Sequence, residues 1–140
     1  MFLVDTNIWL ERLLEQEKSK EVEDFLIEIP IEQMYISDFS LHSIGVIMSK
    51  FKMNKELNTF LNDIIDNANV KILSLTGKEL IDVSKLIVSK NLDFDDAYQA
   101  LIADKYNLDI VSFDKDFKKA KIKSLTPNEA LRKYKASIMK

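Results

Sequence analysis

Short apolar runs alternate along the chain with longer stretches in which apolar residues recur at helical spacing. The runs lie at 2–4, 34–37, 70–73, 109–112 and 122–125, and each predicts a strand. Between the first two runs, Val22, Phe25, Leu26 and Ile29 follow the i, i+3, i+4, i+7 pattern of an amphipathic helix. Because strands that alternate with helices form βαβ units, the pattern predicts an α/β fold with a parallel sheet.

Helix-start signals support this pattern. Thr76 and Thr126 are each followed three residues later by a glutamate, Glu79 and Glu129, which is the spacing of a capping box. Pro30 ends the helix that precedes it. The chain contains only two Gly and no Gly-rich phosphate loop, which excludes P-loop and dinucleotide-binding enzymes of the usual kind.

Length and composition predict one domain over residues 1–140. A chain of 140 residues with 46% hydrophobic content is sufficient for one core. Cysteine is absent, and neither a signal segment nor an apolar run of membrane-spanning length is present. We therefore expect a cytoplasmic protein without disulfides.

The net charge of −3 conceals an asymmetry between two parts of the chain. Residues 1–114 carry 11 Lys and Arg against 21 Asp and Glu, whereas residues 115–140 carry nine against two. Basic clusters supply the sequence-independent part of nucleic-acid affinity, so the segment 115–140 is a candidate for phosphate contacts. A solvated helix face is an equally good interpretation.

Three aspartates fall where an open parallel sheet presents the carboxyl ends of its strands. Asp5 follows the run 2–4, Asp114 follows the run that ends near Phe113, and Asp96 opens a helix. Ligands of open α/β sheets bind at that edge, so carboxylates gathered there indicate a divalent cation. Each aspartate alone is also explained as a turn or capping residue, but repulsion among the three disfavours their coincidence unless a cation neutralises them.

The ordered motifs resemble the PIN domain family. Asp5-Thr6-Asn7 after an apolar strand, Asp96-Ala97 at a helix start and Ser112-Phe113-Asp114-Lys115-Asp116-Phe117 carry the resemblance, which is closest to VapC-like toxins of type II toxin–antitoxin pairs. It implies a three-layer α/β/α sandwich with a five-stranded parallel sheet in the order 3-2-1-4-5. It also implies a Mg²⁺- or Mn²⁺-dependent endoribonuclease that hydrolyses RNA with a metal-activated water.

The resemblance also implies roles for individual residues. Asp5, Asp96 and Asp114 are expected to be catalytic and to hold the metal, with Asp116 as an auxiliary ligand. Thr6, Asn7, Ser43 and Asp95 are expected to surround and orient these ligands. We predict that Lys118, Lys119, Lys121 and Lys123 contact RNA.

One position departs from the family pattern. The family usually has a Glu on the helix after the second strand, and the corresponding residue here is Ser43, next to His42. Asp38, at the end of the second strand, is a candidate replacement ligand, although a residue at that place also caps helices.

Two classes of function follow. The first is the ribonuclease, expected to be a homodimeric toxin that an antitoxin protein silences by occupying the acidic cleft. The second is a catalytically degenerate PIN-like module that binds RNA or a protein, an alternative that Ser43 supports. A phosphoacceptor receiver domain fits less well, because Asp114 follows the fourth strand rather than the third.

Overall fold

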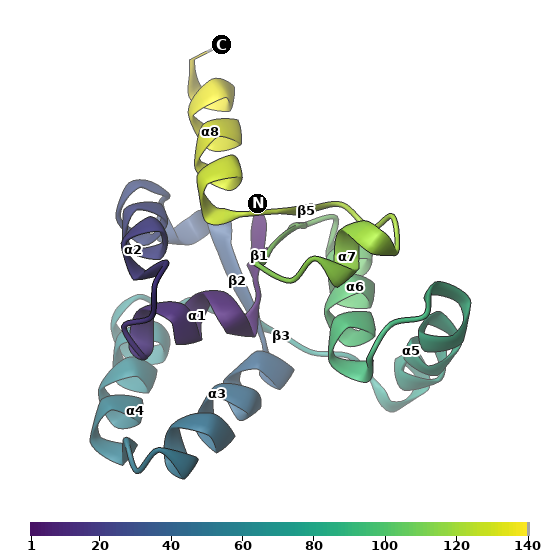
Figure 1. The fold of residues 1–140 in the computed structure, drawn as a ribbon, viewed down its shortest axis with the longest axis horizontal. Helices are drawn as coiled ribbons and strands as arrows, with labels where there is room; N and C mark the ends of the chain where they lie inside the picture. The colour runs from purple at the N-terminus through teal and green to yellow at the C-terminus, as the bar shows by residue number, and fades with distance from the viewer. Residues whose placement is uncertain (140) are drawn as a thin grey trace.

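Five parallel strands form the centre of the protein (Figure 1). The computed structural model describes residues 1–139. The strands are β1 (Phe2–Val4), β2 (Met34–Ser37), β3 (Lys71–Leu73), β4 (Asp109–Val111) and β5 (Ser124–Leu125). Their order is β3-β2-β1-β4-β5, and every neighbouring pair is parallel. The predicted sheet order is therefore confirmed.

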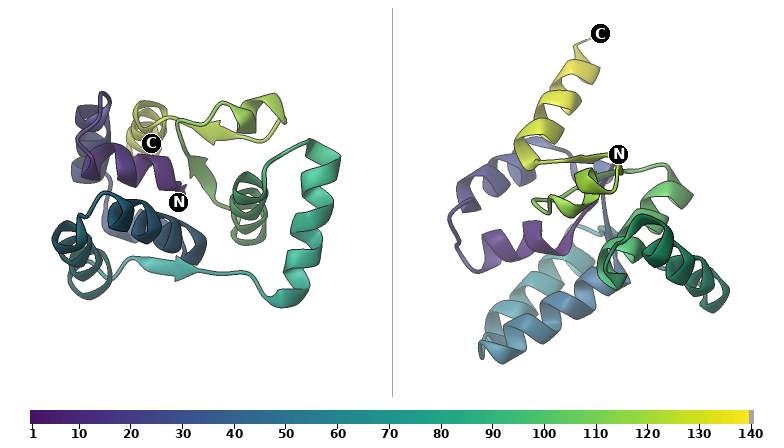
Figure 2. Two further views of the ribbon diagram at one scale, coloured as in Figure 1. Left: turned by 60° about the horizontal axis from the view of Figure 1, so that its bottom comes forward. Right: turned by 45° about the vertical axis from the view of Figure 1, so that its right-hand side comes forward.

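Helices connect the strands and cover both faces of the sheet (Figure 2). They are α1 (Thr6–Leu13), α2 (Ser19–Glu28), the short 3₁₀ helix η1 (Ile31–Gln33), α3 (Asp38–Lys50), α4 (Asn54–Leu61), the π-helical segment η2 (Asn62–Asn67), α5 (Gly77–Lys90), α6 (Phe94–Tyr106), α7 (Asp116–Lys119) and α8 (Pro127–Ile138). Both predicted capping boxes are formed, at the starts of α5 and α8. None of the helices in residues 1–139 has the length and apolar composition needed to cross a bilayer.

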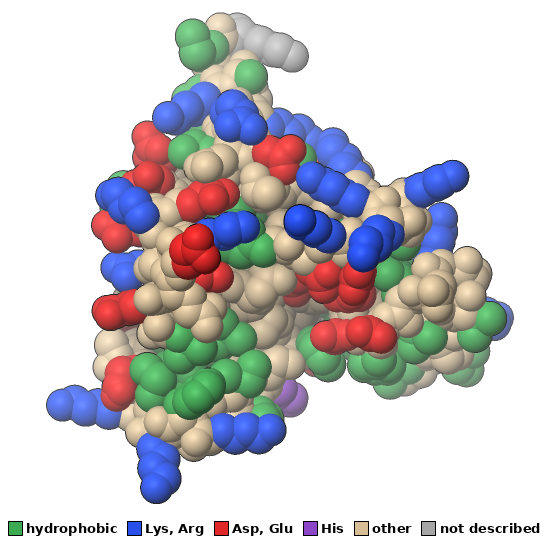
Figure 3. Space-filling model, in the orientation of Figure 1, with side chains coloured by type: hydrophobic (Ala, Val, Ile, Leu, Met, Phe, Trp, Pro, Cys, Tyr) green, Lys and Arg blue, Asp and Glu red, His purple; other side chains and the backbone are tan. Residues whose placement is uncertain are grey.

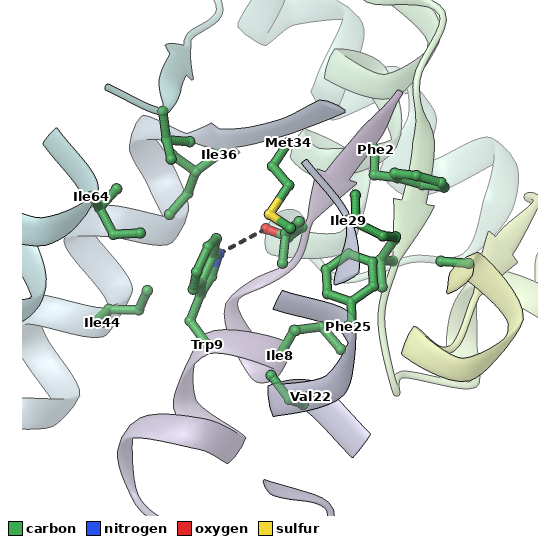
Figure 4. Close-up of a cluster of buried hydrophobic side chains, with 14 of the residues drawn as sticks. Phe2, Ile8, Trp9, Val22, Phe25, Ile29, Met34, Ile36, Ile44 and Ile64 are labelled. Atoms are coloured by element: carbon green, nitrogen blue, oxygen red, sulfur yellow. Dashed lines mark hydrogen bonds between the residues drawn. The ribbon is translucent and has the colours of Figure 1, made fainter. Parts of the chain in front are cut away.

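Alternating side chains of the central strands feed two hydrophobic clusters, one on each face of the sheet. Phe2 and Val4 belong to the cluster beneath α1, α2, α3 and α8, whereas Leu3 belongs to the cluster beneath α5, α6 and α7. In the first cluster Trp9 packs edge-on against Phe60, and its indole N–H donates to the Val4 carbonyl at 3.3 Å (Figure 4). Burial on both faces explains why β1 is a continuous apolar run.

Two segments depart from the predicted pattern. The fifth strand starts at Ser124 rather than at position 122, because Lys121 adopts φ 60° and the Ile122 N–H donates back to the Phe117 carbonyl at 2.8 Å. After α4 the chain changes from α-helical to π-helical hydrogen bonding in η2, where the Ala68 N–H donates to the Asp63 carbonyl at 2.8 Å. That change of register leaves Ile65 40% exposed.

Parallel strands end at a common edge, and this edge positions the site. The Asp5 N–H, just beyond β1, donates to the Val111 carbonyl of β4 at 2.9 Å. The Ser112 N–H, just beyond β4, donates to the Leu125 carbonyl of β5 at 2.9 Å. The first turn of α6 reaches the same edge, since Asp95 and Asp96 line one cavity with Asp5. Segments distant in sequence therefore meet at the carboxyl ends of β1 and β4.

Candidate metal centre at the carboxyl edge of the sheet

A cavity of about 250 Å³ opens at the carboxyl edge of the sheet, and the three predicted aspartates line it together. Its lining comprises Asp5, Thr6, Asn7, Leu10, Phe39, Ser43, Ile47, Asp95, Asp96 and Asp114. Acidic side chains gather in the middle of the face shown in Figure 3. The structure thus brings the predicted carboxylates into one place, together with Ser43 and Asp95.

Asp5 is a buried carboxylate that a network of donors holds in position. Its Oδ1 accepts from the Thr6 N–H and from Gln99 Nε2, both at 2.8 Å, and its Oδ2 accepts from Ser112 Oγ at 2.7 Å. Burial raises the pKa of Asp5, while the bonds from Gln99, Ser112 and Thr6 oppose that rise. The network fixes the carboxylate before any ligand binds.

The two residues after Asp5 connect its turn to α3 and to the segment that follows β4. Thr6 Oγ1 donates to Ser40 Oγ at 2.9 Å, so its side chain does not bond Asp5 directly. Asn7 Nδ2 donates to Ser112 Oγ at 3.0 Å and lies 3.4 Å from Asp5 Oδ2, while Asn7 Oδ1 accepts from the Phe113 N–H at 3.1 Å. Asn7 therefore ties the end of β1 to the end of β4.

Asp96 is a buried carboxylate that lies among other carboxylates. It is 4% exposed, and its Oδ2 has no hydrogen-bond partner within the described residues. Burial, and then the charges of Asp114, Asp95 and Asp5, raise the pKa of Asp96 to about 8. An unpaired buried carboxylate oxygen beside other carboxylates is costly, and a cation would relieve that cost.

Asp114 and Asp116 occupy a turn between β4 and α7. The Asp114 N–H donates to Ser112 Oγ at 3.0 Å, and the Asp116 N–H donates to Asp114 Oδ1 at 2.9 Å. The Asp-x-Asp turn considered from the sequence is therefore formed. Asp114 is half-buried and lines the cavity, whereas Asp116 is exposed and does not line it.

Asp96 also belongs to a second group of carboxylates, with Asp93 and Asp116. Single oxygens of Asp93, Asp96 and Asp116 lie within 4.8 Å of one another, and this spacing is suitable for one metal ion. Asp93 was not among the residues predicted for the site, because its place before the helix is that of an ordinary cap.

Asp38 does not line the cavity. Its Oδ1 accepts from Tyr98 Oη at 2.8 Å and from the Phe39 N–H at 2.8 Å, and the Tyr98 hydroxyl in turn accepts from the Leu75 N–H at 3.1 Å. Ser37, rather than Asp38, caps α3 through its side chain. Asp38 therefore ties α3 to α6, and the structure does not bring it to Asp5 and Asp114.

Gln99, Ser112 and Ser40 take part in the site without having been predicted. Gln99 is 1% exposed, and its Nε2 donates both to Asp5 Oδ1 and to Ser40 Oγ, each at 2.8 Å. The available signal was the spacing of Gln99 three residues after Asp96, which places both on one face of α6. A polar residue on a buried helix face needs a partner, and here the partner is a carboxylate.

The four predicted RNA-contacting lysines do not lie together. Lys118 and Lys119 are on α7, where they pair with Glu129 at 3.5 Å and Asp116 at 3.9 Å. Lys123 pairs with Asp109 at 3.4 Å, at the amino end of β4, which is the opposite edge of the sheet. Lys121 is exposed in the turn after α7. Basic side chains over α7 border the acidic region in Figure 3.

Comparisons with known proteins give one family and several structural neighbours. A family model described as PIN domain matches residues 2–123. No match is found among curated proteins. VapC20 of Mycobacterium tuberculosis, a Sarcin-Ricin loop cleaving toxin, is 15% identical, with a TM-score of 0.77 over 91% of this chain and 100% of that one.

Two further neighbours have similar scores. A chain of FitAcB from Neisseria gonorrhoeae is 20% identical, with a TM-score of 0.70 over 91% of this chain and 98% of that one. A chain of a toxin-antitoxin complex from Klebsiella pneumoniae is 20% identical, with a TM-score of 0.66 over 84% of this chain and 90% of that one. At these identities the likeness shows a shared fold.

Proposed function

The chain belongs to the PIN domain family, whose members are generally nucleases, and from this premise we propose that it is a divalent-metal-dependent endoribonuclease. The observation that carries the proposal is the buried, unpartnered oxygen of Asp96 in a cavity that Asp5 and Asp114 also line. Packing and capping do not account for three carboxylates that line one cavity, whereas a bound cation would offset their mutual repulsion.

The residues present fit a hard cation such as Mg²⁺ or Mn²⁺. The charged groups that line the cavity are all carboxylates, and His42, the only histidine of the chain, is exposed and does not line it. We propose Asp5, Asp96 and Asp114 as the ligands, with Asp116 as an auxiliary one. The cation would supply an activated water and offset the charge that develops on the phosphoryl oxygens.

The side chains around the ligands have separate tasks. Gln99 and Ser112 hold Asp5 in one orientation, which lowers the reorganisation needed when a cation and a phosphate enter. Without a cation, the Asp96 carboxyl holds a proton at neutral pH, because its pKa is about 8. Binding of a cation therefore requires Asp96 to release that proton.

We further propose that the protein is the toxin of a toxin–antitoxin pair and acts as a homodimer on RNA in the cytoplasm. Support comes from the neighbours: one is a toxin that cleaves the Sarcin-Ricin loop, and another is part of a toxin-antitoxin complex. An antitoxin arginine that pairs with these carboxylates would compete with the cation for the same cavity.

A non-catalytic PIN-like module is the second candidate. Ser43 favours it, because this cavity-lining position carries a hydroxyl where the family pattern has a carboxylate. Such a module would bind RNA or a protein without cleaving it.

The test is an RNA cleavage assay with purified protein. We expect cleavage with Mg²⁺ or Mn²⁺, none with EDTA, recovery when the metal is added back, and products that carry a 5′-phosphate. A DNA strand of the same sequence is the substrate control. Full cleavage in EDTA would contradict the metal mechanism, and binding without cleavage at any metal concentration would support the non-catalytic module.

A further inference from the structure

Asp93 is an acidic residue beside the site, and its side chain does not cap α6 as its position predicts. It occupies the N-cap position of α6, with φ −71° and ψ 162°, yet its side chain makes no capping hydrogen bond. Only its backbone carbonyl takes part in the helix, accepting from the Ala97 N–H at 3.0 Å. An N-cap aspartate normally accepts from the N2 or N3 backbone N–H, so this carboxylate is left available for another partner.

The spacing of Asp93, Asp96 and Asp116 matches the dimensions of a coordination sphere. Their oxygens lie within 4.8 Å of one another. Ligand oxygens of Mg²⁺ lie at about 2.0 to 2.1 Å and those of Ca²⁺ at 2.3 to 2.6 Å, so opposite ligands of one ion are roughly 4 to 5 Å apart. One cation therefore reaches all three carboxylates with little movement of the chain.

Asp96 provides the second, independent indication of a ligand. It is only 4% exposed, and its Oδ2 accepts no hydrogen bond among residues 1–139. A carboxylate oxygen that no protein donor satisfies, set among two further carboxylates, lacks a positive partner. Asp96 also lines the cavity with Asp5 and Asp114, so it belongs to both groups of acids.

We propose that Asp93 is a metal ligand, and that Asp93, Asp96 and Asp116 together hold a divalent cation. This inference rests on the proposed function and extends it, because it places Asp96 as a carboxylate shared between this position and the cavity that Asp5 and Asp114 line. In this arrangement the Asp116 carboxylate binds the same cation as Asp93.

The space next to this group suits a phosphate. A cavity of about 370 Å³ adjoins Asp93 and Asp116, and its remaining lining is Lys90, Asn91, Lys119 and Ala120. Each side of this cavity carries one lysine and one aspartate, Lys90 and Asp93 near the end of α5 and Lys119 and Asp116 on α7. A cation held by the carboxylates, together with the two ammonium groups, would neutralise a phosphodiester in the cavity. The substrate strand would therefore pass between the end of α5 and α7.

Calorimetric titration of Mn²⁺ into the full chain tests the assignment. Asp93→Asn removes the charge and retains a good N-cap residue, so the fold is expected to persist. We expect its Mn²⁺ affinity to fall by about 10-fold or more. Asp104→Asn is the matched control, since Asp104 is an exposed aspartate near the other end of α6, and its affinity should stay within about twofold of the wild type.

The outcomes separate this inference from the proposed function. Equal Mn²⁺ affinities for Asp93→Asn and Asp104→Asn, with binding lost in Asp96→Asn, would overturn the role of Asp93 and leave the nuclease proposal standing. A wild-type chain that binds no Mn²⁺ would overturn both. Should Asp93→Asn unfold, Asp93→Ser gives the same comparison, because serine caps helices without a carboxylate.

Discussion

At the scale of single residues, position 43 sets how much negative charge faces the cavity. Ser43 lines the cavity with Asp5, Asp96 and Asp114, so Ser43→Glu adds a carboxylate to the proposed ligand set. We expect Ser43→Glu to tighten Mn²⁺ binding by about 10-fold and to raise cleavage at low metal concentration. Calorimetry and a metal titration of the cleavage rate measure the two effects.

Asp38→Asn is the control for that substitution. Asp38 accepts a hydrogen bond from Tyr98 and does not line the cavity, so its replacement by Asn should leave Mn²⁺ affinity unchanged. Affinity that is untouched by Ser43→Glu but reduced by Asp38→Asn would show that the assignment of the two positions is reversed.

Some residues of the site could be predicted from the sequence, and others could not. Asp5, Asp96 and Asp114 were predicted to meet because the ends of parallel strands share an edge, and they do line one cavity. Gln99 was missed because its role depends on a contact 94 positions away in the chain, which no local pattern encodes. Asp93 was missed because its position before α6 is explained by helix capping, and only the folded structure shows that its side chain makes no capping hydrogen bond.

At the scale of elements, α7 carries Lys118 and Lys119 beside the acidic region, since Lys119 pairs with Asp116 at 3.9 Å. Lys118→Gln and Lys119→Gln should each weaken RNA binding across sequences and reduce the slope of log affinity against log salt by roughly 0.7 on a single strand. Lys123→Gln is the control, because Lys123 pairs with Asp109 at the opposite edge of the sheet. Fluorescence anisotropy at several salt concentrations gives the slopes, and equal slopes for all three variants would assign the α7 lysines to a solvated face.

Elements were predictable where local chemistry determines them. The capping boxes at Thr76 and Thr126 form because each threonine and the glutamate three residues on satisfy each other's backbone N–H groups. The start of β5 was not predictable, because it depends on the left-handed conformation of Lys121. The π-helical turn of η2 was not predictable either, because the change in hydrogen bonding after Leu61 depends on tertiary packing.

At the scale of the whole molecule, the sheet order decides which segments share an edge. A parallel sheet in the order β3-β2-β1-β4-β5 sets β1 beside β4, and this brings Asp5 to Ser112 and Asp114. Strand alternation alone predicted a parallel sheet, whereas the order of its strands came from the family resemblance. The spacing of apolar residues does not show which strands are neighbours, because the order of the strands depends on how the connecting helices cross over the sheet.

At the same scale, the pH dependence of the free energy of unfolding should reveal the protonation of Asp96. The pKa of Asp96 is about 8 in the folded protein against an ordinary 3.8, so between these values the folded state binds more protons than the unfolded chain. In EDTA, the free energy of unfolding should therefore fall as the pH rises through about 8. Asp96→Asn lacks this proton and should lose less stability over the same interval.

The melting temperature at pH 9, with EDTA or with Mg²⁺, tests most directly the claim that the acidic edge is a cation site built around Asp96. At about 100 times its dissociation constant, Mg²⁺ should raise the wild-type melting temperature by roughly 5 to 10 °C, with little effect on Asp96→Asn. In EDTA, Asp96→Asn should melt at or above the wild type. A Mg²⁺ shift of the same size in both proteins, or no shift in the wild type, would contradict the account.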